Sequence, residues 1–214
     1  MRRLPRAFYN RHTIEVAIDL LGCEIVSAVG GNRTSGVIVE TEAYHGPDDP
    51  ACHAFRGQTR RNGIMFGPPG RLYVYFTYGN HHMLNVVCGR DGFPAAVLLR
   101  AAEPRLGGLI MQERRGTDIK TNLCSGPGKL AQALGITLAE NGTDLCRPEI
   151  YIKGPSTRSF EVMASPRIGI GEHGHRKLWR FFIKGNLHVS TQARYVRENN
   201  RSLEAARKLN FDLD

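Results

Sequence analysis

Apolar and polar positions along the chain first follow a helical period and then a strand-like one. In residues 13–22 the apolar positions share one face at helical spacing, with Thr13 placed to cap the start and Gly22 to end the helix. The same reasoning predicts short helices over residues 106–115, 129–134 and 202–209. These helices are few and short, so most of the chain must form other structure.

Short runs rich in β-branched and aromatic residues predict strands through the rest of the chain. These runs are residues 23–29, 36–44, 71–77, 83–88, 95–101, 150–153, 160–164, 167–170 and 178–183. Tight connections at residues 30–32 and 78–80 predict two hairpins. The pattern therefore predicts one α+β domain over residues 1–214 with antiparallel pairing.

A long segment between the predicted strands, residues 46–70, is rich in Gly, Pro, Asp and Arg and has little periodicity. A loop of this length inside a compact domain is more often functional than idle. We expect it to be a binding loop.

The charge of the chain points to a polyanionic partner. Lys and Arg number 29 against 20 Asp and Glu, a formal net charge of +9, which favours nucleic acid or an anionic membrane surface. No apolar run is long enough to span a membrane, and residues 1–5 lack the apolar core of a secretory signal. We expect a soluble, monomeric, cytoplasmic protein without a membrane partner.

The five cysteines are widely separated and form no Cys-x-x-Cys pair. Neither a metal knuckle nor a dense disulfide framework is available, so we expect reduced, mostly buried thiols and no bound metal.

Two glycine-rich motifs suggest phosphate binding but lack the context that this function requires. Residues 169–174 match the dinucleotide fingerprint, yet a basic stretch and a strand-like run follow in place of a helix. Residues 125–129 suggest a phosphate loop but lack its first glycine and its final Ser or Thr. The sequence therefore predicts no nucleotide cofactor, and no cofactor of any kind.

Candidate chemistry begins with two carboxylates. Glu40 and Glu42 have period-two spacing at the end of a buried strand, so both face one side of it, and one of them could serve as a general base. Acidic strand ends are usually solvated, so the spacing alone does not decide. The run over residues 73–78 holds Tyr73, Tyr75 and Tyr78. Aromatic side chains beside a basic surface can stack on an extruded base or wedge into a duplex.

Several separated motifs occur in an order that resembles the alkyladenine (3-methyladenine, methylpurine) DNA glycosylase family. They are Glu42-Ala43-Tyr44, His53, Leu72-Tyr73-Val74-Tyr75, Tyr78-Gly79, Asn85, Leu98-Leu99-Arg100-Ala101 and Cys124-Ser125-Gly126-Pro127. The likeness runs over most of the chain and is more specific than any one motif. It implies a curved, mainly antiparallel sheet with surrounding short helices and a protruding hairpin that inserts into DNA.

The resemblance implies a monofunctional glycosylase of base excision repair. Its substrate would be double-stranded DNA with an alkylated or otherwise damaged purine of the 3-methyladenine, 7-methylguanine, hypoxanthine and ethenoadenine class. Glu42 matches the residue that activates the attacking water, and Arg100 matches the arginine that helps hold this water. A carboxylate on that face can also stabilise the positive charge that develops on the sugar.

The resemblance also assigns the base pocket and the wedge. Tyr44, His53 and Tyr75 match residues that sandwich and read the flipped base, and Asn85 matches the asparagine that narrows the pocket. Tyr78 matches the residue that fills the gap left by the extruded nucleotide, which offsets part of the unstacking cost. The backbone near residues 170–171 matches another pocket wall. No general acid for neutral bases can be named.

Other interpretations stay open at this point. A non-catalytic protein could use the same basic surface and tyrosines to bind distorted DNA, and an enzyme could act on free nucleosides or RNA. Taken singly, His53 could be an ordinary loop histidine, Asn85 a backbone-bonded amide and Arg100 a salt-bridge partner. His45 stands where an apolar residue is common in that family. Its ring would either change the polarity of the pocket or point to solvent.

Overall fold

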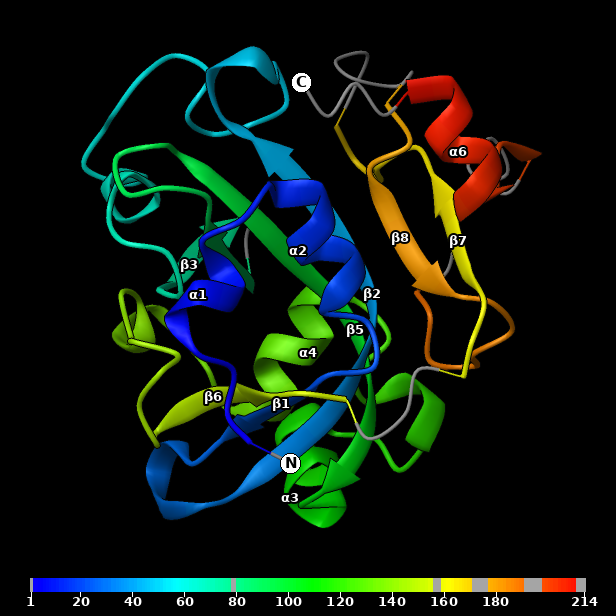
Figure 1. Ribbon diagram of the computed structural model, residues 1–214. Helices are drawn as coiled ribbons and strands as arrows, with labels where there is room; N and C mark the ends of the chain where they lie inside the picture. Colours follow the sequence, from blue (N-terminus) through cyan, green and yellow to red (C-terminus); the bar gives the residue numbers. More distant parts are fainter. Residues whose placement is uncertain (1, 78–79, 156–158, 171–176, 191–197, 211–214) are drawn as a thin grey trace.

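The strands pair into one antiparallel sheet that does not close into a barrel. The computed structural model describes residues 2–77, 80–155, 159–170, 177–190 and 198–210, and within these the sheet has nine strands. Its main path runs β3-β4-β5-β2-β8-β7-β9, and β1 pairs with both β2 and β6 (Figure 1). The strands are β1 Glu24–Ser27, β2 Thr34–His45, β3 Leu72–Thr77, β4 His81–Cys88, β5 Ala95–Leu106, β6 Ile150–Lys153, β7 Val162–Ser165, β8 Arg180–Ile183 and β9 Arg201–Ser202.

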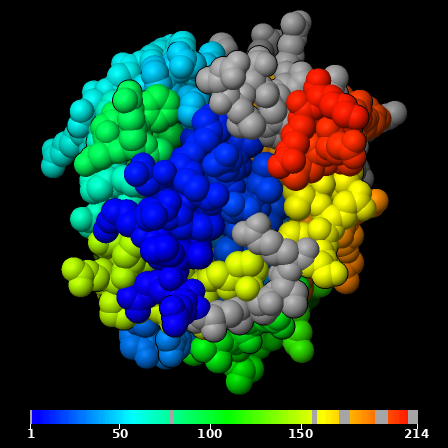
Figure 2. Space-filling model, in the orientation of Figure 1, coloured from blue at the N-terminus to red at the C-terminus, as the bar shows by residue number. Residues whose placement is uncertain are grey.

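Short helices surround the sheet, as the sequence predicts. They are α1 Arg6–Tyr9, α2 Thr13–Asp19, α3 Gly108–Arg115, α4 Pro127–Leu134 and α6 Leu203–Asn210. Helix α2 packs on β2 and β5, and α4 packs on β4 and β5 (Figure 1). The amino-terminal segment covers the middle of this face of the molecule (Figure 2). In the part of the chain that the structure describes, no helix is long and apolar enough to cross a membrane.

The start of α2 differs from the prediction. The capping residue is His12 and not Thr13, because the His12 ring nitrogen accepts a hydrogen bond from the Ile14 amide at 3.4 Å. Thr13 is the first helical residue, and its hydroxyl lies 2.7 Å from Nδ1 of His45. Gly22 has a φ of +80°, which lets the chain turn into β1 after the helix.

Of the predicted strands, the one at residues 167–170 was wrong. These residues form a loop, because their polar groups bond to side chains of other segments in place of a neighbouring strand. The Ile168 amide bonds to the Glu42 carboxylate, and the Arg167 guanidinium bonds to Asp49. The two-residue strand β9 and the helix α1 were not predicted.

The central strands β2 and β5 carry both core residues and site residues, which alternate along the same stretch of the ladder. Apolar side chains of these strands pack with α2 and α4 into the main core. A second cluster, which includes Cys52, Met65 and Tyr73, attaches the loop 46–70 to β3 and β4. All five cysteines are free thiols, and only Cys146 is partly exposed.

Candidate active site

A pocket of about 540 Å³ opens between the loop 46–70, the hairpin β3–β4 and the segment around residue 170. All four residues predicted to contact the base line it, namely Tyr44, His53, Tyr75 and Asn85. Ile170, predicted as another wall, lines it as well. The fold therefore brings together residues that lie far apart in the sequence. Behind the pocket, Glu42 and the backbone amide of Ile168 are in contact although 126 positions separate them.

The aromatic wall is built on β3 and on the loop that faces it. The ring centroids of His53 and Tyr75 are 4.5 Å apart in an edge-to-face arrangement. Nδ1 of His53 lies 3.0 Å from the Tyr73 hydroxyl, a pocket residue to which sequence reasoning gave no separate role. Burial lowers the pKa of His53, and the nearby positive charge of Arg61 lowers it further. His53 is therefore neutral at pH 7.

Asn85 lines the pocket and bonds to the backbone. Its amide Nδ2 donates to the carbonyl oxygens of Tyr73 at 3.1 Å and Met83 at 3.4 Å. The interpretation as a backbone-bonded amide is confirmed, and the role in narrowing the pocket stays a prediction. These bonds fix the plane of the amide within the pocket lining.

Glu42 is fully buried directly behind Tyr44. Its Oε1 accepts a hydrogen bond from the Ile168 amide at 2.7 Å, and its Oε2 accepts one from the Tyr44 hydroxyl at 2.9 Å. Nη1 of Arg100 lies 3.2 Å from the same Oε2. Tyr44 thus links the buried carboxylate to the pocket.

The structure shows that Glu40 and Glu42 have different partners, a difference that the sequence could not reveal. Oε1 of Glu40 accepts from Nε of Arg100 and Nε of Arg180, both at 2.7 Å, and from the Ser190 hydroxyl at 2.8 Å. Its Oε2 accepts from the Ser190 amide at 2.7 Å. Burial raises the pKa of Glu40, but the two guanidiniums outweigh it, and the pKa lies below its usual range. Glu40 is saturated with donors and fixes Arg100, which in turn reaches Glu42.

Sequence reasoning missed an ion pair behind the pocket. Nη1 and Nη2 of Arg167 lie 2.5 and 2.7 Å from the Asp49 carboxylate, and both side chains are fully buried. Arg167 also donates to the Ala43 carbonyl at 2.9 Å, and its guanidinium lies 4.7 Å from the centre of the Tyr44 ring. The pair joins the loop after β2 to the segment that carries Ile168. No local signal could reveal a pair 118 positions apart.

Comparison with known proteins identifies the family to which the chain belongs. Residues 7–187 match the family described as methylpurine-DNA glycosylase (MPG). The chain belongs to this family. A relative from Carboxydothermus hydrogenoformans is 50% identical over 189 residues, which cover 87% of this chain and 98% of the relative. One from Methanocella arvoryzae is 48% identical over 195 residues, or 89% of this chain and 96% of the relative. Both carry the name "Putative 3-methyladenine DNA glycosylase".

Family membership makes the protein a DNA N-glycosylase, an enzyme of DNA repair. It confirms the resemblance seen in the motifs and excludes the non-catalytic DNA binder. It also agrees with the basic composition of the chain, because the substrate of such an enzyme is polyanionic DNA.

Some residues singled out from the sequence lie outside the base pocket or outside the residues that the structure describes. Tyr78 and Gly171 fall outside the described residues, although the β3–β4 hairpin is paired up to Thr77 and His81. His45 does not line the base pocket. It is half-buried, with its ring 4.5 Å from that of His12 and 5.0 Å from that of Phe93.

Among the described residues, no group of three or more His, Cys, Asp and Glu side chains is placed to hold a metal ion. The dinucleotide-like motif begins in the loop at Gly169 and Ile170, and its remaining residues lie outside the description.

Proposed function

We propose that this enzyme is a monofunctional glycosylase that extrudes a damaged purine from duplex DNA and hydrolyses its N-glycosidic bond with a water activated by Glu42. The substrates are purines of the 3-methyladenine, 7-methylguanine, hypoxanthine and ethenoadenine class. One observation carries the proposal: a buried carboxylate, held by defined donors, lies directly behind an aromatic pocket.

The described partners of Glu42 leave one acceptor position of its carboxylate unoccupied. A carboxylate offers about four acceptor positions. Among the described residues, one hydrogen bond occupies Oε1, and one hydrogen bond and one ion pair occupy Oε2. The proposal places the attacking water at the second position of Oε1. Glu42 takes its proton as the oxygen attacks the sugar, and the carboxylate stabilises the oxocarbenium character that develops there.

Arg100 and the Ile168 amide fix the orientation of the carboxylate. Arg100 donates through Nε to Glu40 and lies with Nη1 against Glu42, so its guanidinium plane cannot rotate without breaking both interactions. A group held in place before reaction needs little reorganisation during it. In this proposal Arg100 also donates to the attacking water.

The pocket walls select a planar base that has left the helix. Tyr44 and Tyr75 offer ring faces for stacking, His53 lies edge-on to Tyr75, and Asn85 limits the depth. Unstacking costs a few kcal/mol and least for damaged bases, so part of the selectivity precedes the pocket. Tyr78 is proposed as the wedge that replaces the extruded nucleotide in the duplex.

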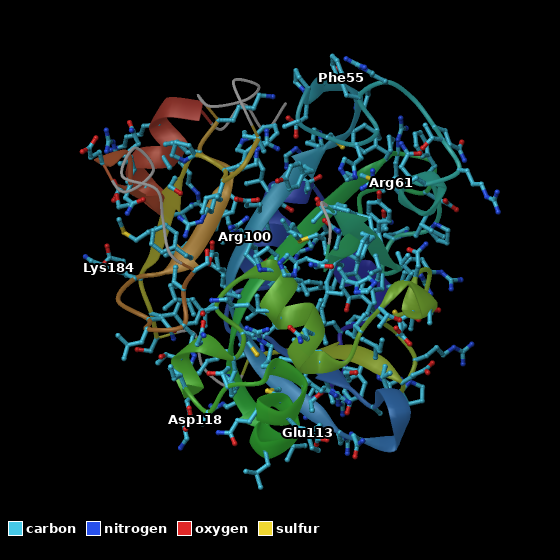
Figure 3. All side chains as sticks on the ribbon, turned by 180° about the vertical axis from the view of Figure 1, so that it is seen from behind. Phe55, Arg61, Arg100, Glu113, Asp118 and Lys184 are labelled. Atoms are coloured by element: carbon cyan, nitrogen blue, oxygen red, sulfur yellow. The ribbon has the colours of Figure 1, made fainter. Side chains whose placement is uncertain are left out.

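The decisive experiment replaces Glu42 by Gln, which keeps the size and removes the base. Single-turnover release of hypoxanthine and 7-methylguanine from oligonucleotide duplexes should fall by at least about a hundredfold, the lower range for a general base. Binding to the same duplexes should remain. Glu113→Gln on α3, an exposed carboxylate far from the pocket (Figure 3), is the matched control and should behave as the wild type. Unchanged release by Glu42→Gln would refute the mechanism.

A second experiment separates duplex DNA from free nucleosides as the substrate. The proposal requires Tyr78→Ala to slow release from duplexes, and it requires binding to weaken steeply between about 50 and 200 mM salt as phosphate counterions are displaced. Equal activity on the free nucleoside, with no effect of Tyr78→Ala, would identify a nucleoside hydrolase instead.

A further inference from the structure

The positive and negative charges of the buried ionised groups around the pocket cancel. Each buried carboxylate of the site has an arginine partner at ion-pair distance, and the charges sum to zero. The carboxylates are Glu40, Glu42 and Asp49, and the arginines are Arg100, Arg180 and Arg167. Burial keeps His53 neutral, so it adds no charge at pH 7.

Arg61 is the exception among the charged residues at the pocket. It comes from the loop 46–70, lines the pocket and is exposed to solvent. Its guanidinium lies 5.1 Å from the centre of the Tyr75 ring, and its Nη2 donates to the Phe76 carbonyl at 3.2 Å. Within the described ranges no carboxylate makes an ion pair with it. Figure 3 labels Arg61 on this loop and Arg100 nearer the centre of the view, and Arg100 is buried.

We propose that Arg61 is a specificity-determining residue, whose positive charge at the Tyr75 ring disfavours permanently cationic purines relative to neutral ones. This inference rests on the proposed function, since it concerns which purines that pocket accepts. Alkylation at N7 of guanine or N3 of adenine gives the base a fixed positive charge, whereas hypoxanthine and ethenoadenine are neutral.

Two electrostatic effects compete at this wall. The negative face of a tyrosine ring attracts a planar cation, which by itself favours an alkylated purine. Arg61 already provides a cation at Tyr75, so a second cation entering the pocket meets an unbalanced like charge at short range. A neutral base has no such penalty and can stack beside the guanidinium.

Arg167 and Arg61 both lie over a pocket tyrosine, but only the charge of Arg167 is compensated by a carboxylate among the described residues. Arg167 also lies over a pocket tyrosine, Tyr44, but its charge is compensated by two close contacts with Asp49. Because Arg61 is exposed, solvent and salt screen its charge strongly. We therefore expect a moderate effect, about three- to tenfold in relative rate.

The test measures single-turnover release from matched duplexes that contain either 7-methylguanine or hypoxanthine. In Arg61→Gln the ratio of the 7-methylguanine rate to the hypoxanthine rate should rise about three- to tenfold. The increase should shrink between about 50 and 200 mM salt. Arg61→Lys keeps the charge and should keep the wild-type ratio. Arg60→Gln, the exposed neighbour, controls for a general loss of positive charge against DNA.

Each other outcome has a definite meaning. Equal changes for both substrates in Arg61→Gln would overturn the inference and assign Arg61 to phosphate contact or to simple covering of Tyr75. A ratio that rises equally in Arg60→Gln would overturn it too, because position at the pocket would not matter. Failure of the wild type to release either base would instead refute the proposed function.

Discussion

The Asp49–Arg167 pair gives a quantitative test of how the base pocket is held together. Asp49→Asn preserves the shape of the side chain but replaces one carboxylate oxygen by an NH₂ group. That group faces the Arg167 guanidinium, so a donor meets a donor where the native contacts are 2.5 and 2.7 Å. Arg167 then keeps its charge at a site where neither side chain is exposed.

The magnitude follows from burial. Removing one partner of a buried ion pair costs about 3–5 kcal/mol, because the other charge is left without compensation. Typical domains have only about 5–15 kcal/mol of stability in total. For a chain of this size, each kcal/mol shifts the melting temperature by about 2–4 °C, so a decrease of about 6–20 °C is expected.

Urea denaturation followed by tryptophan fluorescence measures this loss directly. The protein has a single tryptophan, Trp179, whose ring lies 5.2 Å from the Arg167 guanidinium, so the probe reports on the same packing. The matched control is Glu161→Gln, which removes an exposed ion pair with Lys184 (Figure 3) and should cost at most about 1 kcal/mol. If Asp49→Asn also costs less than about 1 kcal/mol at an unchanged denaturant slope, the reasoning is refuted.

Two further predictions follow from the contacts and pKa shifts. Tyr44→Phe removes the hydroxyl that donates to Glu42 at 2.9 Å. A hydrogen bond to a charged group is worth about 1.5–3 kcal/mol, so single-turnover base release should slow about tenfold or more while the fold is retained. A wild-type rate of release would contradict this role of the hydroxyl. Burial lowers the pKa of four described histidines, so below the ordinary value of 6.5 the unfolded chain binds protons that the native protein does not, and the free energy of unfolding should fall between pH 7.5 and about 5.5. Urea titrations across that range check it, and a free energy that stays constant or rises at acid pH would count against the buried, neutral state of these rings. The histidines are His12, His45, His53 and His188.

Local patterns in the sequence determined most of the elements and the family. Period-two spacing placed Glu40 and Glu42 on one side of β2, and the structure confirms this because Arg100 contacts both carboxylates. Apolar periodicity predicted α2, α3, α4 and α6. The order of the motifs around Tyr44, His53 and Asn85 indicated the glycosylase family. These inferences succeed because side-chain direction within a strand or helix is fixed by backbone geometry over a few residues.

Only the tertiary structure decided which groups are partners. It showed that Glu40 is saturated by Arg100, Arg180 and Ser190, whereas Glu42 keeps an acceptor position. It also replaced the strand predicted at residues 167–170 by a loop that bonds to Glu42 through a backbone amide. Such contacts join residues 60 to 150 positions apart. Their geometry depends on how β2, β5 and β8 pack together, and no periodicity along the chain encodes it.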